Sequence, residues 1–539
     1  MPIADACAAW AAALAPDRVS RDANVVAKYG RSTLVEAPQP LAVLRPTCRD
    51  EVVAAVKIAS QHAVPLYPIS RGRNWGLGAA CPPTAGQAVL DLSLMNKIVE
   101  VNEELAYAVI EPGVTQGQLA EYLDDNEIDL MLDCTGAGRD VSIVGNCLER
   151  GDTFGVYADR FLHCSALEVV LPNGDVITTG LGHLDAAATN LYKWGVGPSL
   201  DGLFSQSNFG VVTRLTLELM PEPETMSVYF FGVEDEQLED LIEALRPLRL
   251  SGVIHTALHL ANDYKALAAM EFYPWDETNG QTPLPESVRR RMRARYPFIQ
   301  GWIGNSAFYG THDQVQAQQR ELKRALRGIT RVQFVTPRKL EWGLRALRVL
   351  ARTRLPVVDR LGTLVERART MLTLMAGIPS NNTLLGTQWR LRREPHEESL
   401  DPLDNGIGMY WFAPICPLTG EHVRRLQRLI EEISAEYQFE PMLNLTLLTG
   451  RAALLTNVVL YDRDDASERE RAARCNNALV ERGIAAGYPP FRCSIDSFRH
   501  LGANDSPYWR FVRQLKRAAD PEGVIAPGRY SPWVFHDAS

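Results

Sequence analysis

The sequence predicts an α+β protein built from two large parts that meet near residue 222. At 539 residues the chain is too long for one ordinary domain. In the first part, short apolar strands alternate with short helices and glycine-containing turns. Pro221 and Pro223 then break the strand pattern, and longer helices begin to alternate with strands. We therefore place the first part at residues 1–222.

Composition and charge narrow the class of protein. Hydrophobic residues make up 46% of the chain and charged residues 22%, as in an ordinary soluble globular protein. The net charge of -9 argues against a general nucleic-acid binder, whose surface needs a basic excess. No apolar run is long enough to span a membrane, and residues 6–14 lack the preceding basic residue of a signal peptide. The nine cysteines include no CxxC pair, so we expect reduced thiols in a cytoplasmic protein.

The chain is organised around a glycine-rich loop at residues 68–78, which follows an apolar strand at residues 64–67. Three glycines in seven residues let the backbone turn tightly and bring its N–H groups against a ligand. Arg71 and Arg73 add cationic donors, which favours a diphosphate as that ligand. The loop has neither the GxGxxG pattern of a dinucleotide-binding loop nor the GK[ST] ending of a nucleoside triphosphate loop. An ordinary surface turn with two solvated arginines is the alternative.

Helices and strands are predicted on both sides of this loop. Residues 47–63 carry acids in the first turn and an apolar face, which predicts an amphipathic helix that leads into the first strand. Alternating apolar residues predict the strands, and a turn at residues 112–115 precedes a second helix. The predicted strands are residues 88–92, 98–101, 106–111 and 130–133, and the second helix is residues 116–126.

Three later motifs complete the first part. Residues 142–146 form a polar turn that opens an apolar helix, whose first N–H groups suit a diphosphate, although a plain helix cap is the alternative. Asn173-Gly174 is a strong turn signal for a hairpin over residues 166–175. Residues 204–213 then lead into a strand at residues 215–219.

This ordered series of motifs resembles the FAD domain of the vanillyl-alcohol oxidase and p-cresol methylhydroxylase family. The resemblance implies a two-part, PCMH-type FAD-binding domain at residues 1–222 and an α/β substrate cap at residues 223–495. It also implies that residues 496–539, with a motif at 520–529, form a C-terminal segment that returns to the flavin. The implied FAD-binding residues are Pro68, Ser70, Arg71, Gly72, Arg73, Asn74, Trp75, Gly76, Pro112, Gly113, Ser142, Gly145, Asn146, Gly210, Val212, Tyr410 and Arg529.

Covalent attachment of the flavin is an open question at this level. Many relatives attach it through a His or Tyr on a cap strand, which here resembles residues 408–415. Counted from Pro414, the histidine position falls on Met409, and Tyr410 is the only nucleophile in the strand. Because side chains alternate between the faces of a strand, a shift of one residue turns Tyr410 away from the flavin. Covalent attachment at Tyr410 and core packing are the two hypotheses.

The substrate site departs from the family pattern. Phenol-oxidising relatives hold the substrate as a phenolate with two tyrosines and an arginine; here the tyrosine positions hold Leu77 and Phe491, and only Arg492 remains. The position shortly before residue 142 where an acid is expected from the family pattern corresponds here to Gly136 or Ala137, so the acid is missing. A buried phenolate needs two or more donors, so either Arg492 and other donors hold a phenolate, or the substrate is not a para-substituted phenol and pairs another anionic group, such as a carboxylate, with Arg492. A structural ion pair of Arg492 is the alternative.

The resemblance also implies the chemistry. Tyr157 matches a family tyrosine near the flavin, and Arg529 would stabilise the negative charge of the reduced ring, so Tyr157, Arg492 and Arg529 are the predicted catalytic residues. The predicted reaction moves a hydride from a benzylic or allylic carbon of a small aromatic alcohol or alkyl-aromatic substrate to flavin N5. Oxygen or a cytochrome-type acceptor would reoxidise the flavin, and relatives are often homo-oligomers.

Other functions stay open. One is a hydroxy-acid or alditol dehydrogenase with non-covalent FAD, and another is a flavin-binding partner subunit of low activity. His255 and His259 would share one face of a helix, but no third ligand is placed and the segment suits a strand as well. We therefore predict no metal site.

Overall fold

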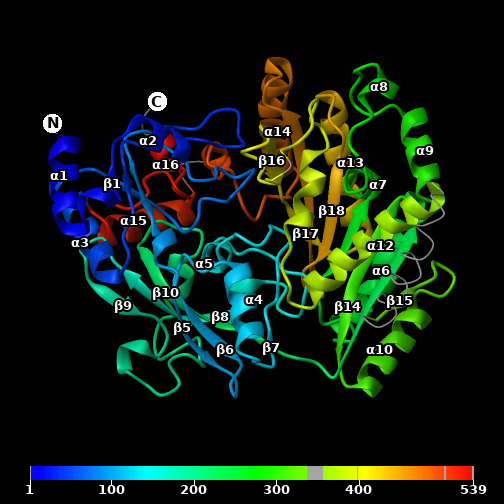
Figure 1. The fold of residues 1–539 in the computed structure, drawn as a ribbon, viewed down its shortest axis with the longest axis horizontal. Coiled ribbons are helices and arrows are strands. Elements are labelled where there is room, and N and C mark those ends of the chain that lie inside the picture. The colour runs from blue at the N-terminus through cyan, green and yellow to red at the C-terminus, as the bar shows by residue number, and fades with distance from the viewer. Residues whose placement is uncertain (1, 337–355, 397, 503–505, 537–539) are drawn as a thin grey trace.

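The structure is a computed structural model that describes residues 2–336, 356–396, 398–502 and 506–536. The N-terminal part and the cap lie side by side in it (Figure 1). Both helices and sheets are present, as the predicted α+β class requires. In the described residues, every helix is too short or too polar to cross a bilayer. All nine cysteines are free thiols.

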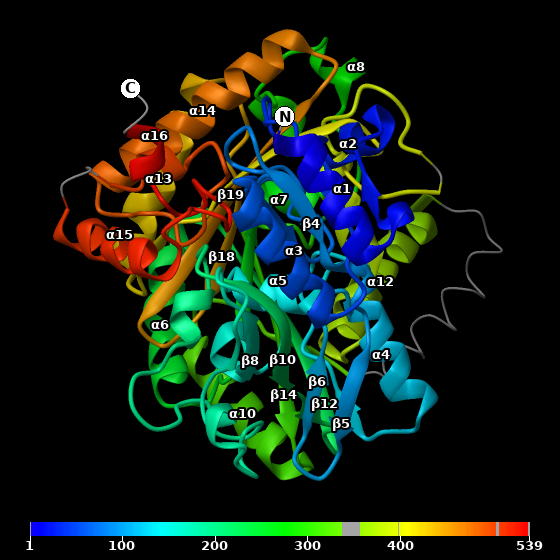
Figure 2. The ribbon, with the colours of Figure 1, turned by 90° about the vertical axis from the view of Figure 1, so that its left-hand side faces the viewer.

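A small sheet and three helices open the N-terminal part (Figure 2). The strand order is β1-β2-β4-β3, with β2, β4 and β3 parallel. Helix α3 begins with two acids and buries Val52, Ala55, Val56 and Ala59, a spacing that puts all four on one face. These elements are β1 (Val19–Ser20), β2 (Val43–Leu44), β3 (Leu66–Ile69), β4 (Ala88–Asp91), α1 (Pro2–Leu14), α2 (Ala23–Tyr29) and α3 (Arg49–His62).

A five-stranded antiparallel sheet, ordered β5-β6-β10-β8-β9, forms the second half of this part. Thr115 and Ser142 cap the helices α4 and α5, because each hydroxyl accepts an N–H of the first turn. The elements are β5 (Ile98–Asn102), β6 (Tyr107–Ile110), β8 (Cys164–Val170), β9 (Val176–Thr178), β10 (Val211–Glu218), α4 (Gln116–Asp125), α5 (Ile143–Leu148), and the separate pair β7 (Leu130–Met131) and β11 (Met220–Pro221).

An antiparallel sheet forms the cap, in the order β15-β12-β14-β13-β18-β19-β16, with β17 also on β19. Its strands are β12 (Thr225–Val233), β13 (Leu258–Asn262), β14 (Trp302–Gly310), β15 (Gln333–Val335), β16 (Ile407–Phe412), β17 (Ile415–Pro417), β18 (Met442–Leu447) and β19 (Ala452–Asp462). Its helices are α6 (Leu238–Leu250), α7 (Asp263–Ala268), α8 (Trp275–Thr278), α9 (Glu286–Arg295), α10 (His312–Ala325), α12 (Pro356–Met375), α13 (Gly420–Glu436) and α14 (Ala466–Ala485).

The two faces of the cap sheet have different roles. One face packs against α6, α10, α13 and α14 and contributes residues such as Leu258, Leu445 and Tyr461 to the largest core cluster. Alternate residues of the same strands, such as His259 and Asn444, point to the other face. That face meets the glycine-rich loop of the N-terminal part, so the strand period decides which side chains can reach a ligand there.

The end of the chain lies against the N-terminal part (Figure 1). Leu66 of β3 forms a parallel bridge with Ile525, which follows α15 (Pro507–Ala519) and precedes α16 (Trp533–His536). Lys516 holds this segment, since its buried ammonium donates to Asp520 and to the carbonyl oxygen of Ile525 at 3.1 Å. The bridge brings residues 526–529 next to the strand that leads into the glycine-rich loop.

Candidate functional site

A cavity of about 590 Å³ lies between the N-terminal part and the inner face of the cap sheet. The glycine-rich loop, the start of α5 and the start of β10 line one side, and strands β13, β14, β16, β18 and β19 line the other. Of the predicted FAD-binding residues, those that line it are Pro68, Ser70, Arg71, Gly72, Arg73, Asn74, Trp75, Ser142, Gly145, Asn146, Gly210, Val212 and Arg529.

The backbone of the glycine-rich loop leaves donors free for a ligand. The five N–H groups of residues 71–75 donate to no acceptor in the described part of the chain. Gly72 has φ +64°, and a Cβ there would lie 2.9 Å from that of Ala80. Gly145 of α5 faces the loop, where a Cβ would lie 3.3 Å from Ser70 Oγ. This close approach of bare backbone suits an anionic group such as a diphosphate.

The two arginines of the loop differ in their partners. Arg73 Nη1 lies 3.4 Å from a carboxylate oxygen of Asp401 and 3.5 Å from one of Asp140. Arg71 makes no ion pair with any described residue. Arg71 is therefore the cation of the loop that stays available to an anionic ligand.

Three predicted FAD-binding residues, Gly76, Pro112 and Gly113, shape the cavity without lining it. Gly76 has φ +74°, and a Cβ there would lie 2.2 Å from the ring of Trp411, so glycine lets the cap strand approach the loop. Pro112 accepts a hydrogen bond from Ser142 Oγ at 2.6 Å and so fixes the cap of α5. Gly113 packs against the backbone carbonyl of Ser93, which a Cβ would contact at 2.4 Å.

Tyr410, for which a covalent flavin link and core packing are the two hypotheses, lies outside the cavity lining. Its neighbours Met409 and Trp411 on β16 line the cavity, whereas Tyr410 lies in the core on the other face of the strand. The Tyr410 hydroxyl accepts a hydrogen bond from the Val35 N–H at 3.1 Å, and burial raises the pKa of this phenol. Tyr410 is thus a packing residue.

Tyr157, one of the predicted catalytic residues, also lies outside the cavity lining. Its hydroxyl donates to the carbonyl oxygen of Leu219 at 2.8 Å, and its ring stacks on His163 with the centroids 4.2 Å apart. Its backbone N–H donates to Asp133 at 2.7 Å. Burial raises the pKa of Tyr157 to about 12. These contacts assign Tyr157 to the structure of the loop that follows α5.

Arg529 lines the cavity and is firmly held. Its Nη1 donates to the Tyr67 hydroxyl at 3.1 Å, its Nε donates to the carbonyl oxygen of Ser207 at 3.2 Å, and its Nη2 contacts the carboxylate of Glu149. Such anchoring fixes the position of the cation at low entropic cost. Arg529 can therefore act as a preorganised positive charge beside a bound ring.

Arg492 lines the cavity with unused hydrogen-bonding capacity. Its Nη2 donates to Asn74 Oδ1 at 2.9 Å, and its Nε lies 4.0 Å from a Glu149 oxygen. That buried Nε has no hydrogen-bond partner among the described residues, and burial lowers the pKa of Arg492. Leu77 and Phe491, at the two positions of the family tyrosines, line the same cavity. The arrangement suits an anionic group joined to an apolar body.

Several polar residues that line the cavity were not among the predicted site residues, and Asp152, His259 and Lys265 are three of them. Asp152 follows α5 and is far in the sequence from His259 on β13 and Lys265 on α7. The Lys265 ammonium lies over the ring of Trp411, 5.1 Å from its centroid. Burial lowers the pKa of Lys265 to about 8, against the opposing effect of Asp152. Only a local signal, the acid directly after Glu149-Arg150-Gly151, could have pointed to Asp152.

His259 is a neutral, satisfied histidine. Its Nδ1 lies 3.1 Å from Thr446 Oγ1, its Nε2 lies 3.4 Å from the carbonyl oxygen of Thr153, and its ring stacks on Phe154 with the centroids 4.1 Å apart. Burial lowers its pKa. Since β13 is a strand, His255 and His259 do not form a helical pair, and no group of three or more potential metal ligands occurs among the described residues.

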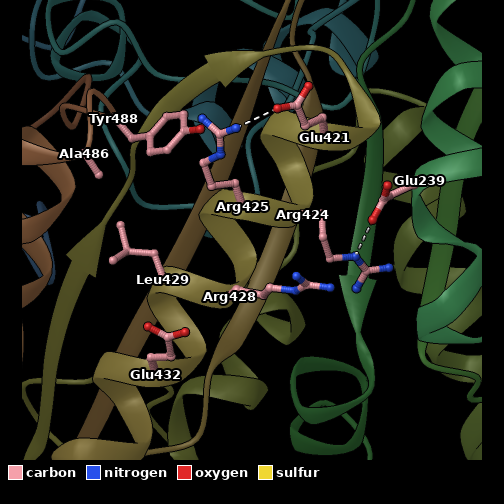
Figure 3. Close-up of a pocket in the computed structure, with 9 residues that line it drawn as sticks. All are labelled: Glu239, Glu421, Arg424, Arg425, Arg428, Leu429, Glu432, Ala486 and Tyr488. Atoms are coloured by element: carbon pink, nitrogen blue, oxygen red, sulfur yellow. Dashed lines mark hydrogen bonds and ion pairs between the residues drawn. The ribbon is translucent and has the colours of Figure 1, made fainter.

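A second hollow, of about 550 Å³, lies on the outer layer of the cap along α13 (Figure 3). Arg424 and Arg425 there are paired with Glu239 and Glu421, respectively, and the remaining lining carries both signs of charge. It has no glycine-rich loop and no contact with the residues discussed above. The larger inner cavity is therefore the candidate active site.

The fold and the site together define a flavoprotein with a substrate cap. An FAD-binding-domain family model matches residues 40–180. The chain is 38% identical to 1'-carboxy-chondrochloren decarboxylase of Chondromyces crocatus, over 98% of this chain and 97% of that protein. It is 29% identical to the 4-cresol dehydrogenase [hydroxylating] flavoprotein subunit of Pseudomonas putida, over 96% and 93% of the two chains.

Solved structures agree with these relatives. Substrate-bound p-cresol methylhydroxylase superposes with a TM-score of 0.86 at 28% identity, covering 98% of this chain and 97% of the other. The isoeugenol complex of 4-ethylphenol oxidase from Gulosibacter chungangensis gives 0.87 at 27% identity, covering 99% and 97%. The chain belongs to the vanillyl-alcohol oxidase and p-cresol methylhydroxylase family of FAD-dependent oxidoreductases. Its free loop amides and anchored Arg529 fit the FAD that this family uses.

Proposed function

We propose that the protein catalyses a two-electron oxidation at a benzylic or allylic carbon of a small aromatic substrate that carries an anionic group, such as a carboxylate. The proposed substrate class rests on one observation, the position and hydrogen bonding of the Arg492 guanidinium. Its guanidinium lines the cavity, is oriented by Asn74, and has a buried Nε without a hydrogen-bond partner in the described residues. An anion bound in the cavity could accept a charge-assisted hydrogen bond from this guanidinium.

The apolar neighbours of Arg492 argue against a standard para-substituted phenol. Leu77 and Phe491 line the cavity but cannot donate a hydrogen bond to a phenolate oxygen. A buried phenolate with a single donor would lose more in desolvation than it regains. The same two side chains favour an aromatic or otherwise unsaturated body next to the anionic group.

The residues of the chain would divide the work as follows. FAD, when bound, supplies a two-electron acceptor that takes a hydride at N5. Arg492 would orient the anionic group, and Leu77 with Phe491 would exclude water from the apolar body. Arg529, held by Tyr67 and by the carbonyl oxygen of Ser207, would provide fixed positive charge. The final electron acceptor in this proposal is oxygen or a cytochrome-type protein, and a homo-oligomer and a cytoplasmic location stay predictions.

Oxidative decarboxylation is the second candidate function. The relative from Chondromyces crocatus, 38% identical over nearly the whole chain, is named as a decarboxylase. If the carboxylate sits on the carbon next to the one that loses a hydride, its C–C bond can break. The bonding electron pair then forms a C=C bond, CO₂ leaves, and the cofactor holds the two electrons of the hydride. This version needs the same anionic substrate and the same Arg492.

Anaerobic bleaching of the flavin absorbance tests both versions. Aromatic acids should reduce the flavin, and the matching primary amides should react with kcat/KM values lower by about tenfold or more, because they lack the charge that pairs with Arg492. Equal rates for an acid and its amide would contradict the anionic substrate. CO₂ released in proportion to reduced flavin would select decarboxylation. Failure of every aromatic substrate would contradict the proposed reaction and favour a partner subunit of low activity.

A further inference from the structure

Glu149 lies between the two arginines of the candidate active site. One of its carboxylate oxygens contacts Arg529 Nη2. The other accepts a hydrogen bond from the Tyr530 hydroxyl at 2.9 Å and lies 4.0 Å from Arg492 Nε. Among the described residues, Glu149 is the only acid within ion-pair distance of either guanidinium. The two cations therefore share one counter-ion.

Hydrogen bonds of the backbone fix this arrangement. Gln206 Nε2 donates to the carbonyl oxygen of Phe491 at 2.8 Å and to that of Glu149 at 3.3 Å. The Glu149 N–H donates to the carbonyl oxygen of Gly145 at 3.1 Å, at the end of α5. Gln206 thus holds the end of α5 next to the segment that carries Arg492. The carboxylate and the guanidinium are placed near each other by the fold.

Burial strengthens the effect of these three charges. The side chains of Glu149, Arg492 and Arg529 expose only 10%, 16% and 17% of their surface, respectively. Because water screens such charges weakly, each one affects what its neighbours can bind. Two guanidinium groups and one carboxylate leave a single positive charge. Loss of the carboxylate charge would raise that to two.

We infer that Glu149 is a positioning residue that holds Arg529 and that its charge lowers the affinity of the cavity for anions. This inference rests on the proposed oxidation of an anionic aromatic substrate. It adds that the negative charge of Glu149 opposes both the binding of the anionic group at Arg492 and the gain of negative charge by the cofactor near Arg529. The carboxylate thus keeps Arg529 in place and, in doing so, weakens the binding of the substrate.

Glu168 provides a matched comparison outside the cavity. It lies on β8, 3.4 Å from a nitrogen of Arg49 and 4.0 Å from one of Arg214, so it also stands between two arginines. Its side chain is 12% exposed, close to the value for Glu149, but it does not line the cavity. A substitution at Glu168 removes the same charge from the same kind of ion pair without touching the candidate active site.

Calorimetric titration of the FAD-loaded protein with benzoate tests the charge of Glu149. Glu149→Gln keeps an acceptor for Arg529 Nη2 and removes the negative charge. It should bind benzoate about tenfold more tightly than wild type, whereas the affinity for neutral benzamide should not change. Glu149→Asp keeps the charge on a shorter side chain and should not bind benzoate more tightly than wild type. Glu168→Gln is the control and should bind benzoate like wild type.

The reduction potential of the flavin tests the same charge without a substrate. Once the Glu149 carboxylate is neutral, the positive charge of Arg529 is no longer offset, so the cofactor should accept negative charge more readily. Glu149→Gln should therefore shift the potential upward from that of wild type. An anaerobic titration against a reference dye measures the shift, and Glu168→Gln should leave the potential unchanged.

The direction of both shifts separates a charge effect from structural damage. Damage would displace Arg492 and weaken the binding of benzoate. A Glu149→Gln protein that loses FAD, binds benzoate no more tightly than wild type or shows no rise in potential would overturn the inference. If wild type binds no benzoate and no aromatic acid reduces its flavin, the proposed function fails, whereas the potential of Glu149→Gln still decides the role of Glu149.

Discussion

Asn74 accepts a hydrogen bond from Arg492 at 2.9 Å, although the two residues are 418 positions apart in the sequence. Asn74 belongs to the glycine-rich loop of the N-terminal part, and Arg492 follows the last helix of the cap. The bond therefore ties the loop that fits the cofactor to the cation that would bind the substrate. Arg492 Nε, which is buried and lies 4.0 Å from a Glu149 oxygen, has no hydrogen-bond partner among the described residues.

Arg492→Ala should slow the reduction of the flavin by an anionic substrate while FAD stays bound. The loss of a charge-assisted contact predicts a decrease in kcat/KM of about 10- to 200-fold, and more if the contact also positions the reacting carbon. Anaerobic stopped-flow reduction measures the effect, and the flavin absorbance of the purified variant is the control. Arg492→Lys should recover part of the rate. An unimpaired Arg492→Ala variant would exclude Arg492 from the substrate site.

Asn74→Ala should have a smaller effect of the same kind. The variant keeps the charge of Arg492 but removes the acceptor that orients it, and a hydrogen bond of this type contributes about 1 kcal/mol, or roughly fivefold. We expect KM for the anionic substrate to rise by about that factor with kcat nearly unchanged. A fall in kcat alone would show that Asn74 acts on the chemical step and not on orientation.

The sequence predicted the cofactor side of the cavity well because its signals are local. Glycines with positive φ, such as Gly72, and capping residues, such as Ser142, are recognisable within a few positions of the chain. The helices expected at residues 47–63 and 116–126 are α3 and α4, with ends that differ by one or two residues.

The sequence predicted the substrate side poorly because that side is assembled by the fold. Asp152 and Lys265 come from two separate elements and have no sequence spacing that links them. Tyr410 illustrates the other limit. It is the only nucleophile in its strand, but the strand period turns it into the core, and only the position of the cap sheet shows which face meets the cavity.

Acid precipitation should release the flavin into the supernatant. Tyr410 is buried on the far side of β16, and the cavity-lining residues of that strand, Met409 and Trp411, are not nucleophiles that attach flavin. The absorbance of pellet and supernatant measures the outcome. Tyr410→Phe should retain FAD and lose about 1 kcal/mol of unfolding free energy, the value of the hydrogen bond to Val35. Yellow colour that stays with the pellet would contradict this expectation.

The rate of flavin reduction should fall as the pH rises through about 8. Burial lowers the pKa of Lys265 to about that value, so the ammonium is present below it and lost above it. The charge of Asp152 raises the pKa of Lys265, and burial lowers the pKa of His259. In Asp152→Asn the fall should therefore move to lower pH. The pH profile of the reduction rate constant measures this shift. A fall at the same pH in wild type and Asp152→Asn would mean that Asp152 does not affect the pKa of Lys265.

Arg390→Met should destabilise the cap strongly. The buried Arg390 guanidinium lies 2.6 Å from a Glu440 oxygen and 2.7 Å from a Glu468 oxygen, and both carboxylates are buried too. Removing the cation leaves Glu440 without this ion pair and Glu468 with only Arg392, 3.4 Å away, which predicts a loss of about 3–5 kcal/mol in the free energy of unfolding. Urea denaturation measures it. The triple variant Arg390→Met, Glu440→Gln, Glu468→Gln should recover most of this loss, because it leaves no charge buried at the site. A single variant as stable as wild type would mean that water or nearby groups neutralise the two carboxylates.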